Sequence, residues 1–125
     1  MTAGDEIRAR APHVLGVYTE TRDTVLEHGL VERELKELCA RYLAQDDDVI
    51  RHAADHSRYD ERQRAALAWA DAIAWDSARA DDALWDRLHA AFSEPELVEL
   101  GYSIAFMLGQ QHWLATRGVT EAPLS

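Results

Sequence analysis

Two histidines and one glutamate are the residues of this sequence whose types and spacing could support proton transfer. His52 and His56 are four residues apart, so on a continuous helix their side chains would share one face. Together with Glu37 they could exchange protons with a substrate or hold a metal ion. A metal site normally needs about three or four ligands, and no ligand beyond the two histidines is fixed by the sequence, so proton transfer without a metal is favoured over metal binding. The structural alternative is that His56 lies at a helix end and His52 faces solvent or a subunit contact.

The single cysteine, Cys39, lies in an apolar stripe with Leu35, Leu38 and Leu43. One cysteine cannot form an internal disulfide, so dithiol redox chemistry within one chain is excluded. We interpret Cys39 as a buried structural residue. A peroxidase or redox sensor that uses this one thiol is the alternative.

Several hydrogen-bonding side chains occur near the end of an otherwise apolar carboxyl-terminal segment, at residues 110–113. They could line a ligand pocket, and we take Tyr42, Gln111 and His112 as candidate substrate-binding residues. Alternatively, buried amide and imidazole groups of this kind satisfy backbone or cross-subunit partners.

These candidates are expected to lie on helices, because apolar residues recur at helical spacing almost throughout and no segment alternates like a strand. The sequence predicts an all-α fold of about six helices. Asp60 with Gln63 and Ser93 with Glu96 have the spacing of capping boxes, and glycines at 29 and 118 suit helix ends. The expected helices span about residues 12–28, 31–45, 46–54, 60–75, 82–92 and 97–117.

Length and composition indicate one soluble globular domain over residues 1–125, with a helical core at about 12–118 and a flexible tail at 119–125. A net charge of −10 argues against nucleic acid and anionic membranes as partners. No stretch approaches the roughly 18 apolar residues of a membrane span, and the amino-terminal residues lack a signal pattern, so a cytoplasmic location is expected. Without a glycine-rich phosphate loop or a nucleophile elbow, we expect no nucleotide-dependent chemistry and no cofactor.

Two blocks of the sequence carry a family resemblance. In segment 59–72 an aromatic residue, an acid and arginines precede an alanine-rich helix, and segment 92–100 links this region to the last long helix. Their order and spacing resemble the carboxymuconolactone decarboxylase / alkylhydroperoxidase D-like (AhpD-like) family. Upstream, Glu37 in segment 35–39 resembles the acidic residue of that family. The resemblance implies an all-α fold that assembles as a homo-oligomer.

The resemblance breaks at the redox centre of the family. In its peroxidase members the glutamate is followed by a Cys-x-x-Cys and a histidine. Carried forward without a gap, that pattern falls on Glu37, Val49, His52 and His56, so both cysteines are missing and the last histidine matches. The segment that leads to Tyr59 is also shorter than is usual in the family. Peroxide turnover with a thiol reductant is therefore expected to be negligible.

The sequence thus predicts a family member that lacks the dithiol and performs lyase- or isomerase-like acid–base chemistry on a small organic molecule. Glu37 and His56 or His52 would exchange the protons. One alternative is a non-catalytic homo-oligomer that binds a small ligand or partner, and another is residual peroxidase activity through Cys39. An oligomer is also expected because the apolar helix faces exceed what one small core can bury.

The position of Glu37 separates these hypotheses. Residue 37 lies one step from the apolar stripe of its helix, so the carboxylate could point along the edge of that stripe into a pocket. If Glu37 is exposed instead, we expect only a surface ion pair with Arg41, one helical turn away.

Overall fold

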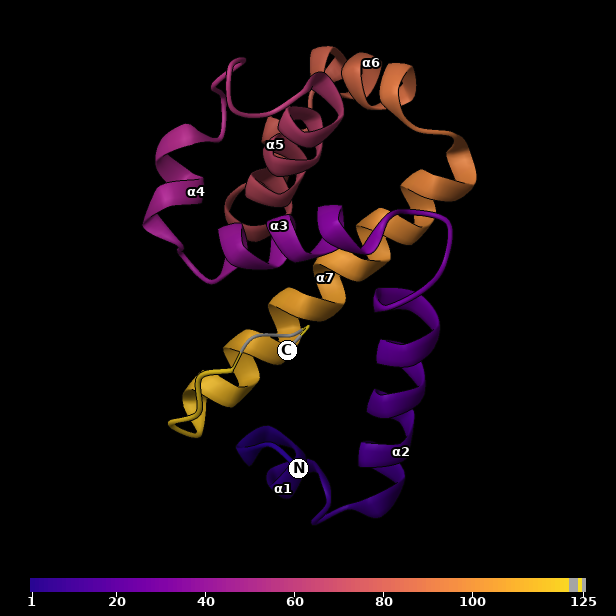
Figure 1. Ribbon diagram of the computed structural model, residues 1–125, viewed down its shortest axis with the longest axis vertical. Helices are drawn as coiled ribbons and strands as arrows, with labels where there is room; N and C mark the ends of the chain where they lie inside the picture. Colours follow the sequence, from indigo (N-terminus) through magenta and orange to yellow (C-terminus); the bar gives the residue numbers. More distant parts are fainter. Residues whose placement is uncertain (122–123, 125) are drawn as a thin grey trace.

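Helices form the whole framework of the described part of the chain, which comprises residues 1–121 and 124 of a computed structural model (Figure 1). No described residue lies in a strand, so the predicted all-α class is confirmed. None of the helices in this part is long and apolar enough to cross a membrane. The α-helices are α1 (Ala3–Arg8), α2 (Pro12–Thr21), α3 (Arg33–Leu43), α4 (Asp47–His52), α5 (Glu61–Trp75), α6 (Asp82–Ala91) and α7 (Glu94–Thr116). A π-helical turn, η1 (Arg22–Leu26), follows α2, and a 3₁₀ turn, η2 (Ser77–Arg79), follows α5.

Capping boxes lie at the starts of α5 and α7, and the start of α5 falls where the sequence predicts it. Asp60 and Ser93 each accept the backbone N–H three residues ahead, while Gln63 and Glu96 accept the N–H of the cap residue in return. Past the end of α7, Gly118 has a positive φ of 73°. The last helix begins earlier than expected, at Glu94, because the cap and the proline of its first turn already start it.

Two features of the amino-terminal region differ from the prediction. Helix α1 was not expected; it begins with a capping box between Thr2 and Asp5 and is too short to persist without tertiary contacts. The single helix expected over 12–28 is divided, because α2 ends at Thr21 and the chain continues as the wider turn η1. At the end of that turn the amide of Glu27 donates to the carbonyl of Arg22 at 2.8 Å.

The core lies where α3, α5 and α7 meet, with α6 packed on α5. Alanines on the inner face of α5, among them Ala65, Ala66 and Ala70, are fully buried and let the neighbouring helices approach closely. On α7, Gly101 lies directly beneath the ring of Trp69, where an added Cβ would be 2.8 Å from the indole. Close packing of this kind requires small residues at the helix crossings.

The only lysine of the chain, Lys36 on α3, is fully buried. Its Nζ donates to the carbonyl of Val25 and, at 2.9 Å, to that of His28, where the backbone leaves η1. The same ammonium group forms an ion pair at 3.0 Å with Glu99 on α7. Lys36 therefore joins α3 to the end of η1 and to the distant helix α7.

The carboxylate of Glu99 holds the loop between η1 and α3. It accepts the amide N–H of Leu30 at 3.0 Å and that of Val31 at 2.7 Å. Gly29 adopts a φ of 102°, and a Cβ there would overlap the carboxylate, so only glycine fits. Partial burial acts to raise the pKa of Glu99, but the amides of Val31 and Leu30 and the Lys36 ammonium hold that pKa below its usual range.

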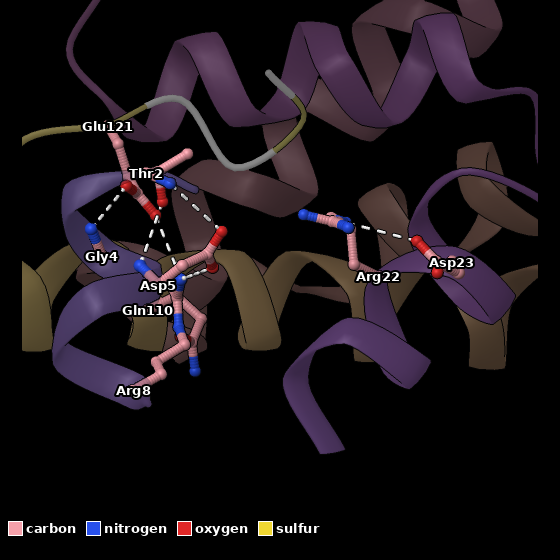
Figure 2. A network of polar contacts seen from close by, with 8 residues as sticks. All are labelled: Thr2, Gly4, Asp5, Arg8, Arg22, Asp23, Gln110 and Glu121. Atoms are coloured by element: carbon pink, nitrogen blue, oxygen red, sulfur yellow. Dashed lines mark hydrogen bonds and ion pairs between the residues drawn. The ribbon is translucent and has the colours of Figure 1, made fainter. Parts of the chain in front are cut away.

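Arg8 of α1 is a second fully buried cation, and it connects the two ends of the chain (Figure 2). Its guanidinium donates to Asp5 at 3.0 Å, to Gln110 of α7 at 3.0 Å and to Glu121 at 3.2 Å. It also lies 3.4 Å from the ring centroid of Tyr18 on α2. These contacts supply the tertiary support that α1 needs.

The segment that the sequence predicts to be a flexible tail contacts the helices through two of its residues. Glu121 accepts the amide of Gly4 at 3.0 Å in addition to its bond from Arg8. Leu124 is buried, and its carbonyl accepts from Arg33 at 2.7 Å. The other residues of the segment include Ala122, Pro123 and Ser125, which lie outside the described part of the chain.

Replacing Lys36 with methionine should lower the free energy of unfolding by about 3–5 kcal/mol, because Glu99 and two backbone carbonyls would remain buried without their cation. Denaturant unfolding followed by circular dichroism measures this. The matched control is Arg51→Met, which removes an exposed cation paired with Asp47 and should change stability by less than about 1 kcal/mol. Equal stabilities of the two variants would contradict the assigned role of Lys36.

Candidate functional site

Glu37, which the sequence marks as the acid, lies on the exposed side of α3. Its side chain is 49% exposed and pairs with Arg33 at 2.9 Å. The expected partner, Arg41, instead pairs with Asp46 at 3.0 Å, which corrects the predicted surface pair. Glu37 lines neither of the two cavities described below. Its carboxylate is therefore held in a solvent-facing ion pair with the arginine one helical turn before it.

The two histidines do not share a helix face, because α4 ends at His52 and His56 lies in the connection to α5. The Nδ1 of His52 lies 2.9 Å from the carbonyl of Asp48. This contact holds the imidazole against the backbone of its own helix. His52 lines neither cavity, and the side chain of Asp48 beside it pairs with Arg58.

A cleft of about 600 Å³ lies between α3, α5, α6 and the connection between α4 and α5. Two of the predicted site residues, Tyr42 and His56, line it. Its charged groups come from α5 and α6, and its floor is apolar. These further lining residues are Ala53, Ala54, Glu61, Arg64, Leu67, Ala68, Asp71 and Arg87.

Tyr42 and Asp71 form the polar end of this cleft. The Tyr42 hydroxyl donates to Oδ1 of Asp71 at 2.7 Å, and Oδ2 accepts from Arg79 at 2.6 Å. Burial, and then the adjacent Asp71 carboxylate, raise the pKa of Tyr42 to about 12. The phenol therefore stays protonated near neutral pH, where it can donate a hydrogen bond but cannot act as a base.

His56 lies at the opposite rim, in contact with Arg64. A terminal nitrogen of the Arg64 guanidinium lies 3.1 Å from Nε2 of His56. Because arginine only donates, Nε2 must accept, and its lone pair is occupied. Arg64 is itself held by the carbonyl of Tyr59 at 3.1 Å and by Glu61 at 3.0 Å. This arrangement orients His56 and occupies the lone pair that would accept a proton from a substrate.

Arg87 supplies the exposed positive charge of the cleft. Its Nε donates to Glu61 at 2.9 Å, which fixes one edge of the guanidinium. Within the described residues, its two terminal nitrogens make no hydrogen bond, and the side chain is 41% exposed. The hydrogen bond from Arg87 is also the main cause that lowers the pKa of Glu61, which stays ionised. The free edge of Arg87 can thus bind an anion.

Gln111 and His112 line a different cavity, of about 230 Å³, near the end of α7. Buried Arg8 also lines it. Gln111 donates to the carbonyl of Ala40 at 3.2 Å, as the structural interpretation of a buried amide predicts. The candidate substrate-binding residues are therefore divided, with Tyr42 in one cavity and Gln111 and His112 in the other.

Cys39 is fully buried in the core, which confirms the structural interpretation of this residue. Burial raises the pKa of its thiol to about 12, so almost no thiolate forms at neutral pH. This disfavours peroxide reduction through Cys39. Across residues 1–121 and 124, no three histidine, cysteine or acidic side chains are grouped so that they could hold a metal ion.

Family models, curated proteins and solved structures provide no match to this chain. The site is therefore defined by its geometry. Sequence reasoning missed Arg64, Asp71 and Arg87. The first two could have been found, because Glu61, Arg64, Ala68 and Asp71 recur at three- and four-residue spacing on one face of the helix, which is otherwise apolar after Arg64. Arg87, on another helix, has no such signal.

Replacing Asp71 with asparagine should lower the pKa of Tyr42 from about 12 towards the ordinary value of 10.0, since a neutral amide no longer opposes phenolate formation. Ultraviolet titration of the tyrosines measures the shift, and Tyr42→Phe identifies the transition. Asp82→Asn, an exposed change outside the cleft, should leave the curve unaltered. An unchanged titration of the Asp71 variant would mean that the two side chains are not in contact.

Proposed function

We propose that this protein binds a small organic acid in the cleft between α3, α5 and α6. The observation that carries this proposal is the free edge of Arg87 beside an apolar floor that includes Leu67 and Ala68. A volume of about 600 Å³ lies within the range of small-molecule sites. The ligand carboxylate would bind Arg87, its apolar body would cover the floor, and a polar substituent would contact Tyr42 and Asp71.

The charged groups of the cleft leave one cation with a free edge. Arg64 and Arg87 both pair with Glu61, and Asp71 pairs with Arg79, which lies outside the lining. Because two guanidinium groups share the carboxylate of Glu61, one edge of Arg87 is available to a ligand. The planar guanidinium of Arg87 can bind a carboxylate through two parallel hydrogen bonds, and its pairing with Glu61 reduces the entropy lost on binding.

Binding is favoured over the acid–base enzyme that the sequence predicts first. Glu37 and His52 lie outside the cleft in contacts of their own, and the Nε2 lone pair of His56 is occupied by Arg64. An enzyme remains the second candidate, because the protonated hydroxyl of Tyr42 shares the cleft with His56. In that case Tyr42 would donate the proton and His56 would accept one after Arg64 moves.

We further propose that the chain is a divergent relative of the carboxymuconolactone decarboxylase / AhpD-like family. This rests on the sequence blocks 59–72 and 92–100, and the contacts between them give the blocks a structural role. Arg62 donates to Glu96 at 2.9 Å and to the carbonyl of Ala91 at 2.6 Å, and it lies 4.1 Å from the ring centroid of Phe92. Arg62 also donates a hydrogen bond at 2.8 Å to Glu32, the residue just before α3. An arginine at this position thus holds the junctions of α3, α5, α6 and α7.

Small carboxylic acids with apolar bodies, such as benzoate, phenylacetate and hexanoate, should shift the amide NMR signals of cleft residues including Ala53 and Ala68. Arg87→Gln should weaken this binding by about tenfold or more, since it removes a charge-assisted pair of hydrogen bonds. Arg51→Gln, on the exposed surface of α4, is the matched control and should bind as the wild type does.

Glu37→Gln distinguishes the cleft from the site first predicted. Because Glu37 lies outside the cleft, this variant should retain full binding. Loss of binding with Glu37→Gln but not with Arg87→Gln would return the site to Glu37. Absence of shifts with every acid tested would refute the proposed ligand class.

A further inference from the structure

Three of the four glutamines of the chain line one cavity, the one of about 230 Å³ near the end of α7. Gln110 and Gln111 come from α7 itself, and Gln45 comes from the turn that follows α3. Apolar side chains, among them Leu43 and Leu114, also line the cavity. Carboxamide groups donate and accept hydrogen bonds without carrying a charge, so their grouping beside apolar surface indicates a site for a neutral polar molecule.

Contacts within the protein orient two of these amides. The guanidinium of Arg8 donates to Oε1 of Gln110 at 3.0 and 3.2 Å, and Nε2 of Gln110 makes no hydrogen bond to a described residue. Gln111 is held the other way round, because its Nε2 donates to the carbonyl of Ala40 at 3.2 Å and its Oε1 accepts from no described residue. One free donor and one free acceptor therefore lie on consecutive residues of α7, oriented before any ligand binds.

Gln45 occupies a backbone position at which glycine is usual. It has a φ of 65° and lies directly after the C-cap of α3. Its amide donates to the carbonyl of Tyr42 and the amide of Asp46 donates to that of Arg41, both at 3.0 Å, which is the bond pair of a helix end with a left-handed residue. The same pair ends α7, where the left-handed residue is Gly118. A glutamine in this conformation lowers stability, so its presence at the edge of the cavity indicates a role for its amide there.

We propose that this cavity is a second binding site, and that its ligand is a small neutral molecule with a carboxamide group on an apolar ring. The ligand carbonyl would accept from Nε2 of Gln110, and one ligand N–H would donate to Oε1 of Gln111. Gln45 would bond the outer edge of the ligand amide, and the ring would lie on Leu43 and Leu114. Cavities of roughly 150 Å³ bind a benzene-sized molecule, so a cavity of about 230 Å³ can hold one ring with its amide.

The charges around this cavity are paired, which selects a neutral ligand. The guanidinium of Arg8 is shared by Asp5 at 3.0 Å and Glu121 at 3.2 Å, so two carboxylates face one cation (Figure 2). Glu121, which lines the cavity, also accepts the amide of Gly4 at 3.0 Å. A ligand carboxylate would be repelled there, and a ligand cation would have to displace Arg8. The cavity thus differs from the cleft, in which Arg87 has a free edge for an acid.

Amide NMR with four compounds of similar shape tests the site and its ligand class. Benzamide, at up to about 10 mM, should shift the signals of Ala44 and Ala115, which line the cavity. Acetophenone has the ring and the carbonyl but no N–H, so it should bind about tenfold more weakly. Benzoate should leave both signals unchanged, and benzamidine, the cationic analogue, should bind more weakly than benzamide. The proposal would be overturned if benzamide gave no shifts or shifted only Ala53 and Ala68 of the cleft, if acetophenone bound equally well, or if benzamidine bound more tightly.

Two substitutions separate a binding role of the glutamines from a structural one. Gln110→Glu keeps an oxygen for Arg8 but replaces the Nε2 donor with a carboxylate oxygen, so benzamide binding should fall about tenfold while the circular dichroism spectrum stays unchanged. Gln45→Gly should raise the midpoint of thermal unfolding by roughly 2–6 °C and yet weaken benzamide binding. Arg51→Gln lies on the exposed surface of α4 and changes the net charge as Gln110→Glu does, so this control should bind as the wild type does. Unchanged benzamide binding in either glutamine variant, or a lower thermal midpoint of Gln45→Gly, would contradict the proposal.

Discussion

The buried ion pair between Lys36 and Glu99 is the contact on which the rest of the structure depends. It joins α3 to α7, and it supplies partners for the carbonyls that end η1 and for the amides of the following loop. None of these groups could be buried without the others, because each would lose its hydration and gain no compensating bond. α3 carries Tyr42, so the pair also sets the position of one wall of the cleft.

The alanine-rich helix α5 explains how a core and a cleft coexist in so short a chain. Its inner alanines allow close contact with α3 and α7, while Ala68 leaves the floor of the cleft open on another side. Polar residues one turn apart, Glu61, Arg64 and Asp71, line the same side. Helical periodicity thus separates the packing role of α5 from the proposed binding role.

Arginine side chains donate most of the side-chain hydrogen bonds that join distant segments of the described chain. Arg8 connects the two terminal regions, and Arg62 connects four helices. Arg87 joins α6 to Glu61 of α5 while one edge of its guanidinium stays free. The guanidinium group suits this because it donates in several directions at once and keeps its charge when partly buried. An acidic chain can therefore still present a guanidinium with a free edge, and a net charge of −10 does not argue against a small acid as ligand.

The sequence by itself determined the helical class, the start of α5 at its capping box, and the burial of Cys39. Each of these follows from residues within one or two helical turns, whose interactions form locally. Tertiary structure alone decided the existence of α1, the burial of Lys36, and the separation of Glu37 and His52 from Tyr42 and His56. These outcomes depend on partners many residues away, such as Glu121 for Arg8 and Glu99 for Lys36. Periodicity tells which face of a helix is apolar, but a polar side chain becomes part of a site only when packing brings its partner to it.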